Sequence, residues 1–119
     1  MADHSEPRPT PNDSAPIVEL VLLDVTDPLV RADLVARSEI GLERYGVLLQ
    51  AHNGRDALRD AYEEALDLVM YLRQAVEEAS NVAARHFPHV IYEGALALAC
   101  GLRHLVADRQ PGPAPGVLR

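Results

Sequence analysis

The chain contains no lysine: its 11 basic residues are all arginines, and they face 18 acidic residues. The formal net charge is −7 at pH 7. Surfaces that bind nucleic acids need clustered positive charge, which steers and holds the phosphate backbone. The composition therefore argues against a general nucleic-acid-binding protein, and we expect no nucleic-acid partner.

The chain also has few cysteines and no long apolar run. Its single cysteine, Cys100, has no partner for an intramolecular disulfide, and its Ala- and Leu-rich neighbourhood predicts a small core residue. No charged start followed by an apolar stretch indicates a secretory signal. The longest apolar run, residues 94–102, is far below the roughly 18 residues needed to cross a bilayer. We therefore expect a soluble, cytoplasmic protein with no membrane partner.

The length of 119 residues suits one domain with a modest core. Residues 1–16 hold several prolines among polar residues, and residues 110–119 (QPGPAPGVLR) are rich in Pro and Gly. Neither end can bury enough apolar surface to order itself, so we predict two disordered tails around a domain at residues 17–109.

No alternating apolar pattern is long enough for a sheet, and the periodicity predicts helices. Asp27 before Pro28 is a strong helix start and Gly46 a helix stop, which predicts a helix over residues 28–45. A second helix is predicted from near residue 54 to about residue 78, where good helix formers run without Gly or Pro. Before it, Asn53 and Gly54 favour a turn, and Asn53 with Asp56 three residues later resembles a capping arrangement.

The remaining segments are less regular. Pro88 is expected to end or kink any helix that reaches it, which predicts a third helix over residues 90–107. The apolar segment at residues 17–23 (IVELVLL) is consistent with a short strand or an extended arm, and its length leaves both open.

Two acidic pairs stand out, Glu39 with Glu43 and Glu64 with Asp67. Spacings of three and four residues place each pair on one side of a helix. Two such helices packed together would form an oxygen-lined site for Mg²⁺, which prefers carboxylates combined with substrate phosphates. The alternative for the second pair is a solvated acidic face. The first pair interrupts an apolar face, so its alternatives are an Arg salt bridge or an exposed rim.

The run EEALDLVMYL at residues 63–72 resembles the helix signature of MazG-like nucleotide pyrophosphohydrolases, and Glu64, Asp67 and Tyr71 match it position by position. Glu39 and Glu43 resemble the first acidic pair of that family, and residues 43–58 (ERYGVLLQAHNGRDAL) are similar to phage and actinobacterial members. The resemblance covers about residues 28–108. The first pair is spaced i,i+4, where the family usually has i,i+3, so Glu63 is an alternative contributor.

The resemblance implies an all-α helical bundle with Mg²⁺, or Mn²⁺ in its place, on Glu39, Glu43, Glu64 and Asp67. It implies hydrolysis of a nucleoside triphosphate to a monophosphate and pyrophosphate. We expect phosphate contacts from residues at the start of the second helix, within it and after it: Arg55, Arg59, Tyr71, Asn81 and Arg85. The alternative for Arg55 and Arg59 is that they are solubilising surface charges. Tyr71 is expected either to pack against the metal-binding helices or to reach a phosphate. His86, His89 and His104 lack metal-ligand spacing and are predicted to be surface or packing residues.

Two other functions fit the same sequence. The chain could be a catalytically weak or inactive relative that serves as a helical binding module, or a protein that sequesters a nucleotide without turnover. Three helices are too few to bury their own apolar faces, so we predict a homodimer or a higher homo-oligomer.

Overall fold

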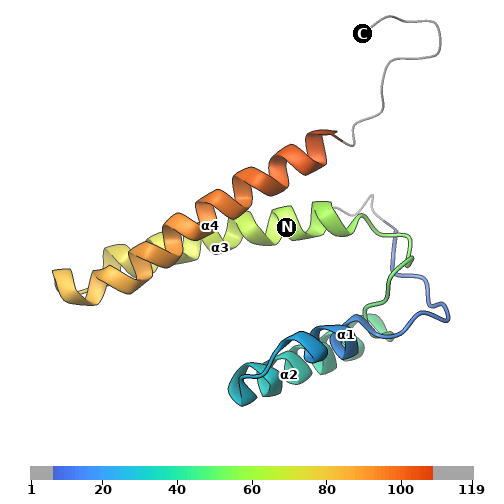
Figure 1. The fold of residues 1–119 in the computed structure, drawn as a ribbon. Helices are drawn as coiled ribbons and strands as arrows, with labels where there is room; N and C mark the ends of the chain where they lie inside the picture. The colour runs from blue at the N-terminus through green and yellow to red at the C-terminus, as the bar shows by residue number, and fades with distance from the viewer. Residues whose placement is uncertain (1–6, 109–119) are drawn as a thin grey trace, which may run out of the picture. The chain divides into compact units, whose positions relative to one another are not determined.

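The computed structural model describes residues 7–108. Within this range the chain forms four helices and no strand: α1 (Ile17–Asp24), α2 (Pro28–Tyr45), α3 (Ala57–Glu78) and α4 (Val82–Asp108) (Figure 1). The prediction of an all-α protein is confirmed for these residues. The contacts divide the chain into two compact units, Met1–Arg55 and Asp56–Arg119, and each is described separately below. The predicted tail at residues 110–119 lies outside the described residues.

The first unit consists of α1 packed on α2, preceded by an irregular arm. The segment at residues 17–23 belongs to a helix, so both a strand and an extended arm are wrong for it. The α1 helix ends at Asp24, with Val25 as its C-cap, and Arg31 of α2 reaches back to this end. The Arg31 guanidinium donates to the carbonyl oxygens of Leu22 and Val25, which lie among the last carbonyls that a helix leaves unpaired. This side chain therefore fixes the corner between α1 and α2.

The bounds of α2 are those predicted from the sequence. Asp27 Oδ1 accepts hydrogen bonds from the backbone nitrogens of Leu29 at 2.8 Å and Val30 at 3.3 Å. Gly46 follows the helix with φ of 74°, a left-handed conformation that glycine adopts without a Cβ clash. No residue of α2 is buried.

Residues 7–16 form hydrogen bonds with the loop that precedes α3, although their composition predicts disorder; residues 1–6 lie outside the described part. Thr10 N donates to Asn53 O at 2.9 Å, and Asn12 Nδ2 donates to the carbonyl oxygens of Ala51 and His52. Asn53 is buried in this contact, with 7% of its surface exposed. Polar side chains, rather than apolar burial, hold the arm here.

The second unit is a helical hairpin in which α3 and α4 lie side by side (Figure 1). Asp56 caps the start of α3 by accepting from Arg59 N at 3.1 Å. Before it, His52 and Gly54 both have positive φ, and Gly54 belongs to the pair for which the sequence predicts a turn. The buried residues of the hairpin are Ala65 and Val76 of α3 with Ala95, Ala99 and Val106 of α4. The small size of these buried side chains lets the two helices approach closely.

The α4 helix begins eight residues before the predicted start at residue 90, so that prediction is wrong. Asn81 Oδ1 accepts from Ala84 N at 2.9 Å and begins the helix, and Pro88 lies inside it. Proline lacks only its own N–H, so the helix continues with one backbone hydrogen bond fewer. Cys100 on this helix is exposed, which also corrects the expected core position. By length and composition alone, α4 is long and apolar enough to cross a membrane, a test that core helices of soluble proteins also meet.

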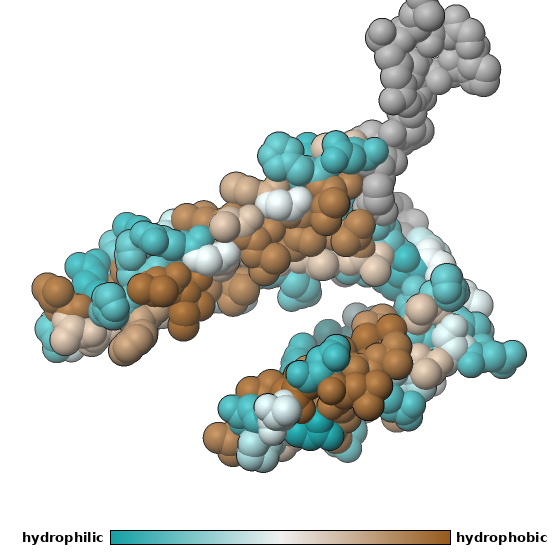
Figure 2. Space-filling view, in the orientation of Figure 1, coloured by the Kyte–Doolittle hydropathy of each residue, from teal (hydrophilic) through white to brown (hydrophobic). Residues whose placement is uncertain are grey.

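Large apolar side chains remain exposed along α4, and Figure 2 shows hydrophobic residues along this hairpin. One set is spaced alternately four and three residues apart and is called here the outer stripe: Phe87, Ile91, Gly94, Leu98, Gly101 and Leu105. Its four large members are between 50% and 73% exposed. A Cβ placed on Gly94 or Gly101 would meet no atom within 4 Å, so neither glycine serves packing inside the hairpin.

Candidate metal and phosphate site

The second acidic pair lies on the solvent-exposed side of α3. At 100° per residue, Asp67 lies about 170° around the helix from the buried Ala65 and Val76, and Glu64 lies about 110° from them, on the flank. Both carboxylates are exposed, and among residues 7–108 neither is joined to a cation by an ion pair. Two neighbouring carboxylates without a cation repel each other, so a bound cation would lower their free energy. Packing of the other side of α3 against α4 keeps the helix that bears the two carboxylates in place.

The neighbours of this pair are engaged in different ways. Arg59 Nε lies 3.9 Å from Glu63 Oε1, an i,i+4 ion pair in which both side chains are about half exposed. Glu63, the alternative ligand, is therefore already paired, whereas Glu64 is not. Tyr71, one turn after Asp67, is 68% exposed and contributes little packing within the hairpin. Its hydroxyl is accessible to a ligand that lies along the acidic face.

The first acidic pair lies on α2, in the other compact unit. Glu39 and Glu43 are exposed, and so are their apolar neighbours Val35 and Leu42, at 40% and 43%. No ion pair joins either carboxylate to an arginine among the described residues, which fits the exposed-rim alternative better than the salt bridge. The prediction that this pair converges with Glu64 and Asp67 stays a prediction.

No group of three or more His, Cys, Asp or Glu side chains in the described part of the chain is placed to hold a metal ion. Two carboxylates on α3 are nevertheless a donor set that suits Mg²⁺. This ion is commonly held by one or two carboxylates, its other positions being filled by water and substrate phosphates. The residues therefore fit a metal that is bound together with a phosphate substrate.

The five residues expected to contact phosphates are dispersed. Arg55 donates through Nη1 to Pro7 O at 2.9 Å, which ties it to the N-terminal arm. Arg59 and Tyr71 lie on α3 near the acidic pair, as described above. Asn81 uses its side-chain oxygen to cap α4. Arg85 lies at the α3–α4 turn, where its Nη2 is 2.9 Å from Glu77 Oε2.

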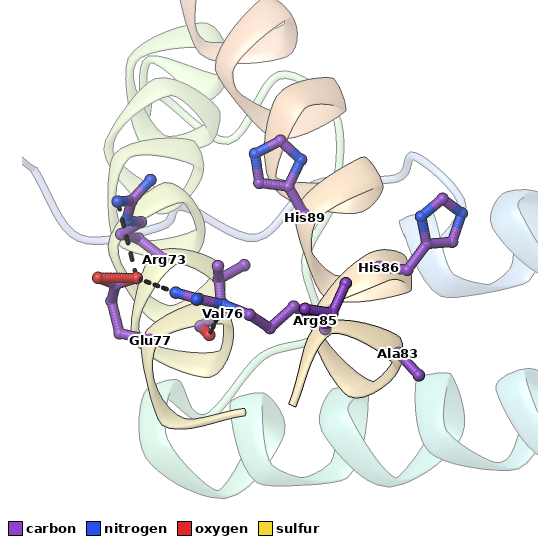
Figure 3. Close-up of a pocket in the computed structure, with 8 residues that line it drawn as sticks. Arg73, Val76, Glu77, Ala83, Arg85, His86 and His89 are labelled. Carbon is purple, nitrogen blue, oxygen red and sulfur yellow. Dashed lines mark hydrogen bonds and ion pairs between the residues drawn. The ribbon is translucent and has the colours of Figure 1, made fainter. Parts of the chain in front are cut away.

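The structure also shows a concavity that sequence analysis missed. It lies at the α3–α4 turn, has a volume of about 510 Å³, and is called here the turn pocket (Figure 3). Arg73, Glu77, Arg85, His86 and His89 supply its polar lining. In the sequence these residues belong to two segments separated by the turn, and the predicted helix start at residue 90 placed no helix under His86 and His89. The sequence signal for this pocket is the pair Arg73 and Arg85, which lie at similar distances before and after the turn.

No protein-family model matches the chain, and no curated protein and no solved structure is significantly similar to it.

Proposed function

We propose that the protein is a Mg²⁺-dependent nucleoside triphosphate pyrophosphohydrolase with a MazG-like helical fold. One observation supports this function most directly: Glu64 and Asp67 are exposed on one side of a helix whose other side is packed, and neither forms an ion pair with a residue in the described part of the chain. If these carboxylates served only solubility, they would not need to lie close together, because dispersed carboxylates are solvated equally well. Here two carboxylates occupy adjacent turns, and they match the acidic signature of the family that the sequence resembles.

In this proposal Glu64 and Asp67 bind the metal, and Glu39 and Glu43, the first acidic pair, are the other two proposed ligands. Bound Mg²⁺ would supply charge neutralisation at the triphosphate and a water of lowered pKa. Glu64 and Asp67 would hold this ion at a fixed position on α3, where its charge would offset that of the phosphate chain while water replaces pyrophosphate on the α-phosphorus. Arg59, at the positive end of the α3 dipole, supplies charge for the remaining phosphate oxygens.

The outer stripe of α4 leads us to include self-association in the proposal. The residues of α4 that face α3 include Tyr92, Ala95, Ala99, Leu102 and Val106, with alternating spacings of three and four. The outer stripe repeats this heptad spacing on the adjacent side of the same helix. A heptad stripe is the pattern by which one helix packs against another, and the glycines at residues 94 and 101 leave room for close approach. We propose that a second copy of the hairpin covers this stripe.

The test of the activity is release of pyrophosphate from a panel of nucleoside triphosphates, with Mg²⁺, with Mn²⁺ and with a chelator. The proposal requires release with either metal and none with the chelator. A chain that binds a triphosphate without releasing pyrophosphate would instead be a sequestering protein. A chain that neither binds nor cleaves any member of the panel would be a helical binding module, which the wide apolar surface of α4 favours as the second candidate.

A further inference from the structure

The turn pocket carries more positive than negative charge in its lining. Arg73 and Arg85 share one carboxylate oxygen, Glu77 Oε2, at 3.6 Å and 2.9 Å from their Nη2 atoms. Two guanidinium groups against one carboxylate leave a formal charge of +1, before either histidine is protonated. Figure 3 shows the two arginines converging on Glu77 from α3 and α4. The pocket therefore favours an anion over a cation.

Both guanidinium groups are held in place by contacts besides Glu77. Arg85 Nε donates to Val76 O at 3.2 Å, near the end of α3. The guanidinium carbon of Arg73 lies 5.5 Å from the centre of the Tyr92 ring, an arrangement in which a cation is attracted to the ring face. Arginines held in this way lose less rotamer freedom when they bind a ligand.

The beginning of α4 lies at the same pocket. Val82 and Ala83 line it, and Asn81 caps the amide of the next residue, Ala84. Among the described residues, the amides of Val82 and Ala83 donate no hydrogen bond. Unpaired amides at the start of a helix of 27 residues attract an anion through both hydrogen bonds and the helix dipole. His86 and His89 extend the donor set, and His89 Nδ1 is 3.4 Å from Glu93 Oε1, which does not line the pocket.

We propose that the turn pocket binds the phosphate group of a small ligand. Phosphate oxygens match the planar donor fork of arginine, and the pocket volume suits a small molecule rather than a bare ion. The pocket is separate from the acidic pair: Arg73 and Glu77 follow Asp67 by six and ten residues, which is about 9 and 15 Å along the helix axis, on a different flank of α3. The inference therefore stands whether or not the proposed hydrolysis occurs.

The experiment is calorimetric titration of the full chain with pyrophosphate and, separately, with a nucleoside monophosphate, in the presence of a chelator. The chelator removes divalent metals and so prevents ligand binding through the acidic pair. Binding that persists is therefore binding at the turn pocket, and this result does not depend on whether the protein hydrolyses triphosphates. We expect binding of at least one of the two ligands. Tighter pyrophosphate binding would identify the ligand chemistry as a bare phosphate chain, and tighter monophosphate binding would identify it as a nucleotide.

Three variants make the titration specific. Arg85→Gln removes one cation and should weaken binding about tenfold or more, the usual effect of losing a charge-assisted hydrogen bond. Glu77→Gln removes the carboxylate that competes with the ligand and should tighten binding several-fold, a gain that misfolding cannot produce. Arg103→Gln makes the same charge change elsewhere on α4 and should leave the affinity within about twofold. Absence of binding by the wild type, equal losses in Arg85→Gln and Arg103→Gln, or no gain in Glu77→Gln would overturn the proposal.

Discussion

Gln50 and Asn12, 38 residues apart, form a reciprocal pair of hydrogen bonds. Gln50 Nε2 donates to Asn12 O at 2.7 Å, and its Oε1 accepts from Asn12 N at 3.2 Å. The same Nε2 also donates to Ser14 O at 2.7 Å. The side-chain amide of Gln50 thus pairs with both the backbone N–H and the backbone C=O of Asn12, as the backbone of an adjacent β-strand would. It links the N-terminal arm to the loop before α3, beside the bonds from Thr10 N and Asn12 Nδ2.

Replacing this side chain should loosen the arm. Gln50→Ala removes three hydrogen bonds, and at about 1 kcal/mol for each partly exposed bond it should destabilise the arm by roughly 1–3 kcal/mol. The amides of Thr10 and Asn12 should then exchange with solvent faster, which hydrogen exchange measures. Gln74→Ala on α3 is the matched control, because the Gln74 side chain bonds to the exposed Glu78 alone among residues 7–108. Unchanged exchange at Thr10 and Asn12 would contradict this role of Gln50.

Asp27 should account for much of the local stability of α2. Asp27→Ala removes both capping hydrogen bonds and should lower the free energy of unfolding by about 1 kcal/mol. Asp33→Ala, an exposed position in the first half of the same helix, removes the same charge without a cap and should have a smaller effect. Denaturant unfolding monitored by circular dichroism compares the two. Equal losses of unfolding free energy in the two variants would show that the loss comes from removing a charge and not from removing the cap.

The α3–α4 hairpin should depend on Val76. This side chain is 3% exposed, and Val76→Ala leaves a cavity where two methyl groups packed against α4, with an expected loss of about 2 kcal/mol. Val82→Ala makes the same chemical change at a position that is 85% exposed and should stay within about 0.5 kcal/mol. Thermal unfolding of both variants checks the difference, and similar midpoints would contradict the packing of this face.

The outer stripe of α4 should control self-association. Leu98→Glu places a charge on this stripe, and burying it in an interface without a partner is unfavourable, so the wild-type oligomer should dissociate. Leu23→Glu on α1, where the leucine is 81% exposed, is the control and should leave the mass unchanged. Analytical ultracentrifugation at micromolar concentration measures both. A monomeric wild type, or a Leu98→Glu variant with the wild-type mass, would contradict the assembly proposal.

Local sequence signals predicted part of this fold well. The bounds of α2 follow from Asp27, Pro28 and Gly46, each of which acts through its own backbone and nearest neighbours. The end of α3 also agrees with its sequence pattern. The predicted start of α4 is wrong because Pro88, which was expected to end or kink a helix, lies inside one that Asn81 caps. In the structure the proline is tolerated at the loss of one hydrogen bond.

The features that the sequence did not predict depend on contacts between distant residues. The order of residues 7–16 depends on Asn12 and Gln50, whose pairing no composition rule reveals. The turn pocket forms because Arg73 and Arg85 lie close together across the hairpin. This closeness could be predicted only if α4 were known to begin at residue 82. The acidic residues of α3 were found because they lie on one helix, where spacing alone determines the shared face. The convergence of the two acidic pairs stays a prediction because it depends on packing between separate helices.

The central claim is that the acidic pair on α3 supports metal-dependent cleavage of nucleoside triphosphates, and Asp67→Asn tests it most directly. The amide keeps the size of the side chain but removes the charge that holds the cation, and it also relieves repulsion with Glu64. The measurement is the rate of pyrophosphate release with Mg²⁺, alongside the thermal unfolding midpoint without metal, for the wild type, Asp67→Asn and the control Asp33→Asn. The account predicts wild-type release that Asp67→Asn abolishes and Asp33→Asn retains, with an unfolding midpoint in Asp67→Asn that is equal or higher. An Asp67→Asn protein as active as the wild type, or a wild type inert toward every triphosphate with Mg²⁺ and Mn²⁺, would contradict it.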